Sequence, residues 1–164
     1  MAATRISFVC LGNICRSPLA EGVFRHLADQ AGCLAQFRVE SAGIGDWHVG
    51  DAPDPRAQAT ARAHGLQLTS RARQFQASDF SRLDLVVALD GDVAQDLRQM
   101  APTRADRAKI RLLREFDPQL PDHPRDTDLD VPDPYYGGPA VFEATYQMIE
   151  RSSRRLLESL TPPP

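Results

Sequence analysis

The sequence Val9-Cys10-Leu11-Gly12-Asn13-Ile14-Cys15-Arg16-Ser17-Pro18 joins an apolar run to the start of a helix. The run before it, which includes Ile6 and Phe8, is typical of a buried parallel strand. After it, Ser17 and Pro18 indicate a helix opening, with the Ser17 hydroxyl as N-cap and proline at the first helical position. The sequence therefore predicts a strand, a tight loop and a helix N-terminus.

This loop is suited to anion chemistry. It gathers backbone N–H groups and the positive end of a helix dipole around one point, and Gly12 and Asn13 can adopt the backbone angles of a tight anion nest. A buried strand cysteine is usually an inert small hydrophobe, but the field that attracts phosphate also stabilises a thiolate at Cys10. Arg16 can hold two phosphate oxygens with its planar guanidinium. A nucleophile beside an anion clamp predicts phosphoryl transfer through a phosphocysteine.

Length and composition limit the possibilities for the whole chain. We expect the 164 residues to form one domain, 1–164, with 161–164 as a disordered tail. A formal net charge of −3 indicates no general attraction to nucleic acid. No stretch approaches the roughly 20 apolar residues of a membrane span, and no signal-peptide pattern is present, so we expect a cytoplasmic protein without membrane insertion.

The thiols and imidazoles form no recognisable metal site. The chain contains three cysteines, Cys10, Cys15 and Cys33. Its four histidines are His26, His48, His64 and His123. The odd number of cysteines argues against a disulfide framework, and neither set has metal-ligand spacing. We therefore expect reduced thiols, no metal and no cofactor, and we assign the histidines no role.

Apolar periodicity predicts alternating strands and helices along the rest of the chain. Strands are expected at 37–41, 83–89 and 110–113, and helices at 18–31, 55–65, 93–100 and 140–160. This alternation predicts an α/β sheet with right-handed crossovers, in which ligands bind beyond the carboxyl ends of the strands. The Cys10 loop, residues 41–47 and Asp90 would then meet at one cleft.

A phosphate ester also needs a general acid to protonate its bridging oxygen. The long loop 117–139 offers six candidates, Asp117, Asp122, Asp126, Asp128, Asp130 and Asp133. A calcium loop starting at Asp126 is excluded, because Val131 occupies the position of the required glycine. Asp133 is the best acid, because Pro134 stiffens its backbone and two tyrosines follow it, but spacing alone leaves its neighbours as alternatives.

Cys15 has two interpretations. It packs within the loop, or it captures an oxidised Cys10 as a disulfide and so protects it from irreversible oxidation. We favour capture, because a second thiol on the same loop brings the two sulfurs within reach.

The loop, with Ala20-Glu21, resembles the signature of low-molecular-weight protein tyrosine phosphatases of bacterial type. Further matches follow in the family's order: Ser41-Ala42-Gly43, Trp47, Ala52-Pro53-Asp54-Pro55-Arg56, Ala72-Arg73-Gln74, Leu89-Asp90 and Asp133-Pro134-Tyr135-Tyr136-Gly137. The resemblance implies a four-stranded parallel sheet in order 2-1-3-4, helices on both faces, and a phosphate-binding loop after the first strand.

The resemblance also implies roles for individual residues. Cys10 is the nucleophile, Arg16 is the transition-state clamp, and Asp133 is the general acid and then the base for water. The phosphate-binding residues are Leu11, Gly12, Asn13, Ile14, Cys15, Arg16 and Ser17. Support of the loop falls to Asn13, Ser17 and Ser41, and the walls of the substrate cleft to Ile14, Trp47, Tyr135 and Tyr136. One departure is Ser70, which stands where many members have a histidine that tethers the loop asparagine.

A deep slot with apolar walls suits a phosphotyrosine ring. Three alternatives remain. Phosphoarginine phosphatases of the same fold carry a smaller hydroxyl residue at the position of Ile14. Arsenate reductases relay a disulfide through cysteines, and residues 70–100 contain none. A non-catalytic phosphate-binding module would keep Arg16 but has no use for Asp133.

We expect the partners to be a phosphotyrosine protein and inorganic phosphate as product. A bacterial tyrosine kinase is a familiar partner of similar bacterial proteins. Exposed Trp47, Tyr135 and Tyr136 are consistent with a monomer or a weak homodimer.

Overall fold

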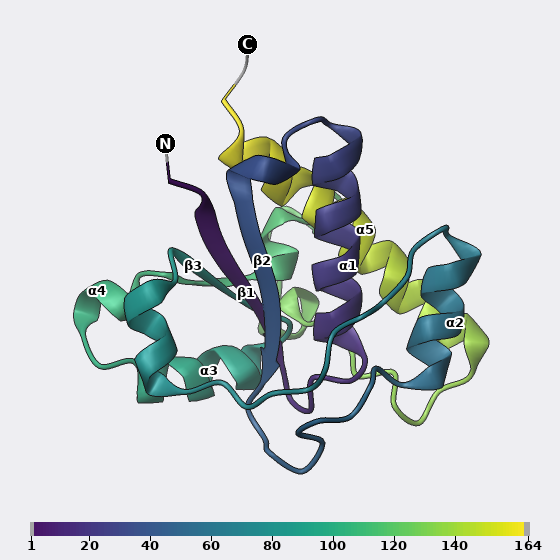
Figure 1. Cartoon of the computed structure of the whole chain (residues 1–164), viewed down its shortest axis with the longest axis horizontal. Coiled ribbons are helices and arrows are strands. Elements are labelled where there is room, and N and C mark those ends of the chain that lie inside the picture. The colour runs from purple at the N-terminus through teal and green to yellow at the C-terminus, as the bar shows by residue number, and fades with distance from the viewer. Residues whose placement is uncertain (1, 163–164) are drawn as a thin grey trace.

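A parallel sheet of four strands lies at the centre of the computed structural model, which describes residues 2–162 (Figure 1). The strands are β1 (Thr4–Cys10), β2 (Phe37–Gly43), β3 (Leu85–Ala88) and β4 (Ile110–Leu112). Their order is β2-β1-β3-β4, so the expected order 2-1-3-4 is confirmed. Cys10 lies opposite Gly43, and Val9 lies opposite Ala88. The segments that follow these three strands therefore meet at one edge of the sheet.

Helices cover both faces of this sheet. The α-helices of the described chain are α1 (Arg16–Gln30), α2 (Pro55–Ala63), α3 (Gly91–Met100), α4 (Arg104–Arg107) and α5 (Pro139–Leu160). The 3-10 helices are η1 (Leu34–Gln36), η2 (Ala77–Arg82), η3 (Leu113–Phe116) and η4 (Asp126–Leu129). In Figure 1, α1, α2 and α5 lie on one side of the sheet and α3 and α4 on the other.

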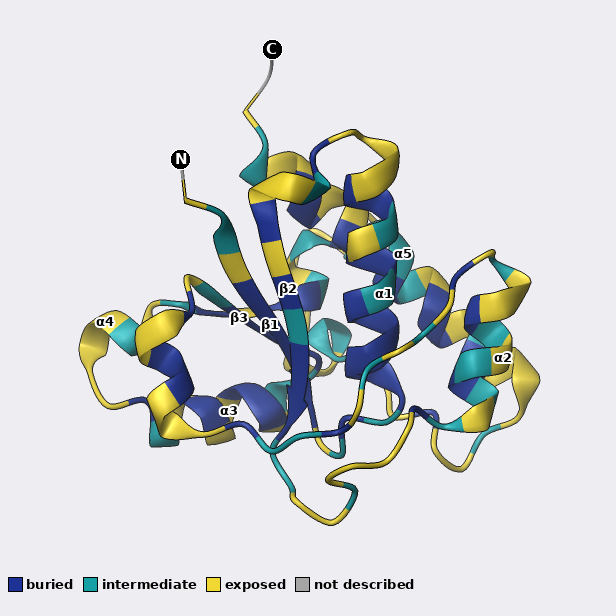
Figure 2. Cartoon of the chain, in the orientation of Figure 1, coloured by how far each residue is buried: buried dark blue, intermediate teal, exposed yellow. Residues whose placement is uncertain are grey.

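Alternate side chains of β1 enter two separate cores. Phe8 packs with Phe24 of α1 and Ile149 of α5, whereas Val9 packs with Phe80 and with Leu97 of α3. Figure 2 shows the carboxyl-terminal halves of the central strands as buried, with helices on either side. An apolar run without alternation, such as that in β3, is what a parallel strand needs when both of its faces are covered.

The start of α1 differs from the prediction that Ser17 is its N-cap. The helix begins at Arg16, and Cys15 occupies the N-cap position without a side-chain hydrogen bond. The Ser17 hydroxyl points instead toward the sulfur of Cys10 and the amide of Asn13. Pro18 is tolerated in the first turn because backbone N–H groups there have no partner within the helix.

Other element boundaries differ from the predicted ones by one or two residues, and some short elements were not predicted. β3 begins at Leu85 rather than at 83, because Asp84 exchanges hydrogen bonds with the backbone of Arg5. α3 begins at Gly91, since Asp90 caps it through the N–H of Val93. α4 and the 3-10 helices lack a periodic apolar signal. Of the expected tail 161–164, residues 163–164 lie outside the described residues.

Across residues 2–162, no helix combines the length and apolar character needed to cross a membrane.

Candidate active site

The loop between β1 and α1 carries the nucleophile candidate at its start. Cys10 is the last residue of β1 and is only 3% exposed. Its Sγ accepts a hydrogen bond from the backbone N–H of Asn13 at 3.2 Å and lies 3.0 Å from Ser17 Oγ. Asn13 adopts a left-handed conformation with φ of 57°, which turns its N–H back toward the sulfur. These donors would stabilise a thiolate.

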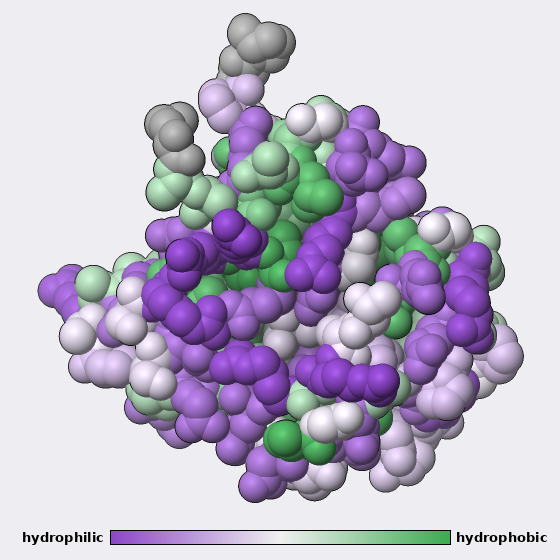
Figure 3. All heavy atoms as spheres, in the orientation of Figure 1, coloured by the Kyte–Doolittle hydropathy of each residue, from purple (hydrophilic) through white to green (hydrophobic). Residues whose placement is uncertain are grey.

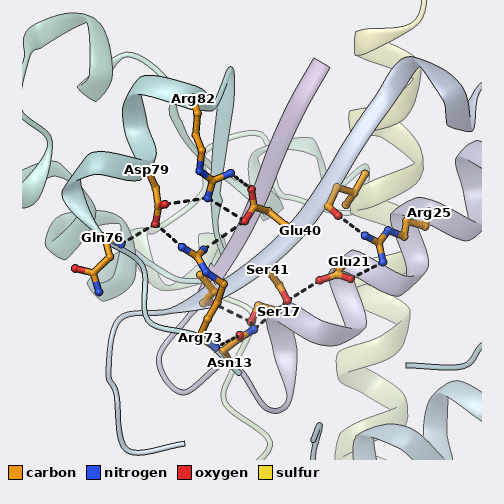
Figure 4. A network of polar contacts seen from close by, with 12 residues as sticks. Asn13, Ser17, Glu21, Arg25, Glu40, Ser41, Arg73, Gln76, Asp79 and Arg82 are labelled. Atoms are coloured by element: carbon orange, nitrogen blue, oxygen red, sulfur yellow. Dashed lines mark hydrogen bonds and ion pairs between the residues drawn. The ribbon is translucent and has the colours of Figure 1, made fainter. Parts of the chain in front are cut away.

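Asn13 holds this loop in shape through three hydrogen bonds of its side chain. Its Nδ2 donates to Ser17 Oγ at 2.8 Å and to Ser41 Oγ at 3.0 Å, and its Oδ1 accepts from the N–H of Arg73 at 3.0 Å. Figure 4 shows this amide at the lower end of a longer polar network. The structure thus brings together the three residues expected to support the loop.

The network continues from Ser41 into α1. Ser41 Oγ donates to Glu21 Oε1 at 2.7 Å, and Glu21 pairs with Arg25 at 2.7 Å (Figure 4). Arg25 in turn donates to the carbonyl oxygen of Val39. Burial raises the pKa of Glu21, although its bonds to Ser41 and Arg25 partly offset that effect.

Arg73 tethers the loop, although Ser70 stands where the resemblance led us to expect a histidine. The backbone N–H of Arg73 satisfies Asn13 Oδ1, and its guanidinium pairs with Asp79 at 2.8 Å and Glu40 at 3.3 Å. Arg82 pairs with the same two carboxylates (Figure 4). Sequence reasoning missed this ion cluster, because its members come from separate segments.

Arg16 is fixed in a single orientation at the floor of the site. It is 3% exposed, and its Nη1 donates to Asp90 Oδ2 at 2.5 Å and to the carbonyl oxygen of Val131 at 2.9 Å. Burial opposes the charge of Arg16, but nearby Cys10 and Asp90 outweigh that effect and raise its pKa above the ordinary value. The predicted position of Asp90 at the cleft is therefore explained by its pairing with Arg16.

Only one of the six candidate acids lines the same pocket as Cys10. Asp133 has a side chain that is 47% exposed, and its Oδ2 lies 3.7 Å from Arg16 Nη2. Asp117 is buried against Arg114 and Arg151, and Asp130 accepts from the N–H of Gly91. The remaining candidates, Asp122, Asp126 and Asp128, do not line the pocket.

The pocket has a volume of about 440 Å³. It is lined by Cys10, Leu11, Gly12, Ile14, Cys15, Arg16, Trp47, His48, Asp133, Tyr135 and Tyr136. Cleft-wall residues expected from the sequence are therefore together at this pocket. Figure 3 shows a small hydrophobic area at the surface over the loop between β2 and α2. Trp47 and Val49 of this loop are exposed.

His48 was missed by sequence reasoning. It lies against Gly12, where an added Cβ would be 3.1 Å from His48 Cδ2, and its Nδ1 lies 3.1 Å from Asp51 Oδ2. Its position next to Trp47 was the only signal in the sequence. A side chain larger than glycine at position 12 would push this imidazole away from the pocket.

Cys15 also lines the pocket, as a buried free thiol. Burial raises its pKa to about 12, and the nearby Asp54, Cys10 and Asp133 add to the effect. Cys15 is therefore a neutral thiol at pH 7.

No group of three or more His, Cys, Asp or Glu side chains in the part of the chain that the structure describes is arranged to hold a metal ion. The site instead offers a sulfur nucleophile, a fixed guanidinium and a half-exposed carboxyl group around one pocket. This set fits transfer of a phosphoryl group to sulfur with protonation of the leaving oxygen.

Comparison with known proteins identifies similar chains over nearly the full length. Residues 5–162 match the family model described as low molecular weight phosphotyrosine protein phosphatase. A low molecular weight protein-tyrosine-phosphatase of Streptomyces coelicolor is 52% identical over 156 residues, which cover 95% of this chain and 93% of the relative.

Solved structures agree. A protein tyrosine phosphatase from Entamoeba histolytica superposes with a TM-score of 0.89 at 32% identity, covering 96% of this chain and 97% of the other. A Drosophila arginine phosphatase superposes with a TM-score of 0.85 at 33% identity, covering 97% and 99%.

Proposed function

This chain belongs to the low molecular weight phosphotyrosine protein phosphatase family, a family of phosphoric monoester hydrolases, and from that premise we propose that it hydrolyses phosphotyrosine through a phosphocysteine on Cys10. The observation that carries the proposal is that Cys10 and Arg16, at the two ends of one loop, share a pocket with Asp133, which comes from a segment far away in the chain. Such a set has the roles that a phosphatase without a metal requires.

In the first step, the Cys10 thiolate attacks phosphorus and the bond to the bridging oxygen breaks. Asp133 donates its proton to that oxygen, so the tyrosine leaves as a neutral phenol. The loop N–H groups and Arg16 neutralise the charge on the non-bridging oxygens. Because Asp90 and Val131 hold the Arg16 guanidinium, it needs little reorganisation when substrate binds.

In the second step, the Asp133 carboxylate takes a proton from water, and the resulting hydroxide attacks phosphorus. The bond between sulfur and phosphorus breaks, and Cys10 leaves as a thiolate. The N–H of Asn13 and the hydroxyl of Ser17 lie close to that sulfur and stabilise the charge that returns to it. Inorganic phosphate is the product.

The pocket walls favour an aromatic substrate. Ile14, Trp47 and the two tyrosines provide apolar surface for a ring between the protein surface and Cys10. A phosphoserine side chain is too short to bring its phosphate to a nucleophile at the base of such a pocket. The arginine phosphatase among the structural neighbours shares the fold, so Ile14 is the observation that favours tyrosine over arginine here.

The test compares turnover of phosphotyrosine, phosphoserine and phosphoarginine peptides by the wild-type protein and by Cys10→Ser. We expect hydrolysis of phosphotyrosine only, and a loss of at least about 10³-fold in Cys10→Ser with phosphate binding retained. Unchanged activity in Cys10→Ser would refute the mechanism. Preference for phosphoarginine, or arsenate reduction with thiols, would establish one of the other activities of this fold instead.

We further propose that the protein is cytoplasmic and acts on a phosphotyrosine protein such as a bacterial tyrosine kinase.

We also propose weak self-association that blocks the site. Tyr136 is 98% exposed and lines the same pocket as Tyr135 and Trp47, which supports such an association. Sedimentation of wild-type protein and Tyr136→Ser over a concentration series tests this: a dimer that persists unchanged in the variant would contradict it.

We also propose that Cys15 captures Cys10 after oxidation. Both thiols line the same pocket, and Cys15 is the nearest thiol to Cys10 along the chain. Attack of Cys15 on a sulfenic acid at Cys10 would release water and form a disulfide that cellular thiols can reduce.

A further inference from the structure

Two residues at the start of α2, Asp54 and Arg56, contact both loops that form the active site. The N–H of Asp54 donates to the carbonyl oxygen of Ile14 in the phosphate loop at 2.8 Å. On the other side, Arg56 Nη1 donates to the carbonyl oxygens of Tyr135 at 2.6 Å and Gly137 at 3.2 Å. Neither residue has a part in the chemical steps above.

The two side chains form one rigid unit. Arg56 Nε and Nη2 donate to the two oxygens of Asp54 at 3.0 Å and 2.9 Å, and Asp54 Oδ1 also caps the N–H of Arg56 at 2.8 Å. Pro55 between them limits the backbone. The hydrogen bond from Arg56 holds the pKa of Asp54 below its ordinary value, so the pair stays ionised at neutral pH.

The remaining faces of the Arg56 guanidinium are also occupied. Its central carbon lies 4.8 Å from the centre of the Phe142 ring in α5 and 5.4 Å from that of the Tyr135 ring. A planar guanidinium with its edge bonded to carbonyls and its faces against aromatic rings has little freedom to rotate. Arg56 therefore fixes the carbonyl of Tyr135 relative to α2 and α5.

The position of Tyr135 matters because its backbone holds the proposed acid. The N–H of Tyr135 donates to Asp133 Oδ1 at 3.1 Å. Residues 134–137 form a turn, in which the N–H of Gly137 donates to the carbonyl oxygen of Pro134 at 2.8 Å. The nearest cation to Asp133, Arg16 Nη2, is 3.7 Å away, which is beyond hydrogen-bond distance. The half-exposed Asp133 thus depends on this turn for its placement.

We propose that Asp54 and Arg56 form a brace that sets the distance between the phosphate loop and the Asp133 loop, and that Arg56 is a positioning residue for the general acid. A chain of hydrogen bonds connects Ile14 to Asp54, Asp54 to Arg56, Arg56 to Tyr135, and Tyr135 to Asp133. This inference rests on the proposed phosphatase activity. Arg56, which is partly exposed, then affects the rate of the reaction and not only the stability of the fold.

The test is Arg56→Met, which keeps the apolar stem and removes the donors. Its matched control is Arg62→Met, an exposed arginine on the same helix that has neither role. We expect Arg56→Met to lower kcat/KM for a phosphotyrosine peptide by about tenfold to a hundredfold, because a small misplacement of a catalytic group has effects of that size. For aryl phosphates with good leaving groups we expect a loss of less than about threefold, since these need little protonation.

Competitive inhibition by inorganic phosphate should be unchanged in Arg56→Met, because the anion site itself is intact. Arg56→Lys should recover part of the loss, since lysine retains a donor for one carbonyl but not the fork for Asp54. A uniform loss across leaving groups, or weaker phosphate binding equal to the loss in kcat/KM, would show a general structural role and overturn the inference.

A double-mutant cycle separates positioning from stability. In the Asp133→Ala background, Arg56→Met should change kcat/KM by less than about twofold, because the group that it positions is absent. Additive losses would contradict the inference. If the wild-type protein hydrolyses no aryl phosphate, the proposed function fails; if it does and the leaving-group dependence of Arg56→Met is that of the wild type, only the brace fails.

Discussion

The two thiols of the phosphate loop are both buried, and their different neighbours give them different chemistry. Cys10 Sγ receives the N–H of Asn13 and lies beside the Ser17 hydroxyl. Cys15 is buried with carboxylates nearby, and its pKa is raised to about 12. Cys10 therefore accepts a backbone hydrogen bond, whereas Cys15 is kept neutral at pH 7.

The proposed capture of oxidised Cys10 by Cys15 predicts how activity returns after oxidation. After peroxide treatment, wild-type activity should return on addition of a thiol, whereas Cys15→Ser should recover less than about half under the same conditions, because the sulfenic acid is oxidised further. Because a pKa of about 12 leaves a thiolate fraction that rises roughly tenfold per pH unit, recovery of the wild type should improve between pH 7 and pH 9. Activity assays after timed peroxide exposure measure both effects. Equal recovery in the two proteins would leave Cys15 with a packing role only.

Among the secondary-structure elements, α5 is joined to η3 by one buried carboxylate. Asp117 has a fully buried side chain that pairs with Arg151 of α5 at 2.8 Å and with Arg114 of η3 at 3.0 Å, and it accepts from the N–H of Gln119 at 2.8 Å. Burial would raise the pKa of Asp117, but Arg151, the Gln119 N–H and Arg114 together lower it. The charged form therefore stabilises the fold.

Asp117→Asn should lower the free energy of unfolding by about 3 kcal/mol at pH 7, because it leaves two arginines without their partner. The sign with pH follows from the lowered pKa: this stability is present above the ordinary aspartate pKa of about 3.9 and is lost as the pH falls below it. Urea unfolding should show a clear difference in free energy of unfolding between the wild type and Asp117→Asn at pH 7, and a smaller difference near pH 3. The same difference in free energy of unfolding at both pH values would contradict a stabilising role for the charge of Asp117.

The same elements show which local structure can be predicted from the sequence. The strands and the long helices were predicted, because apolar periodicity and residues such as Asp54 and Pro55 act locally. The prediction that Ser17 caps α1 was wrong, because a serine before a proline gives the same local pattern whether its hydroxyl caps the helix or faces a cysteine seven residues away. A local sequence pattern does not show whether the helix N–H groups or a distant side chain will bind the Ser17 hydroxyl.

For the molecule as a whole, the residues of the site were predicted but most of the contacts that hold them were not. A short motif was enough to place Cys10 and Arg16 at one cleft, whereas the choice of Asp133 among six aspartates depended on the resemblance to a known family. The bond from Arg16 to Val131 and the cluster of Arg73, Glu40 and Asp79 join segments far apart in the chain. Such contacts depend on how loops pack across the sheet, and a single sequence carries no direct signal for them.

The central claim is that one phosphoryl group passes through the sulfur of Cys10. The most direct test is acid quenching of Asp133→Ala during turnover of an aryl phosphate with a good leaving group, which needs little protonation in the first step, followed by mass spectrometry of the intact and digested protein. Removal of the base for water should slow hydrolysis of the intermediate, so we predict one phosphate group on Cys10 and none in the matched Cys10→Ala, Asp133→Ala double variant. Phosphate on another residue, or turnover without any phosphoenzyme when the chemical steps are slow enough to trap it, would contradict the account.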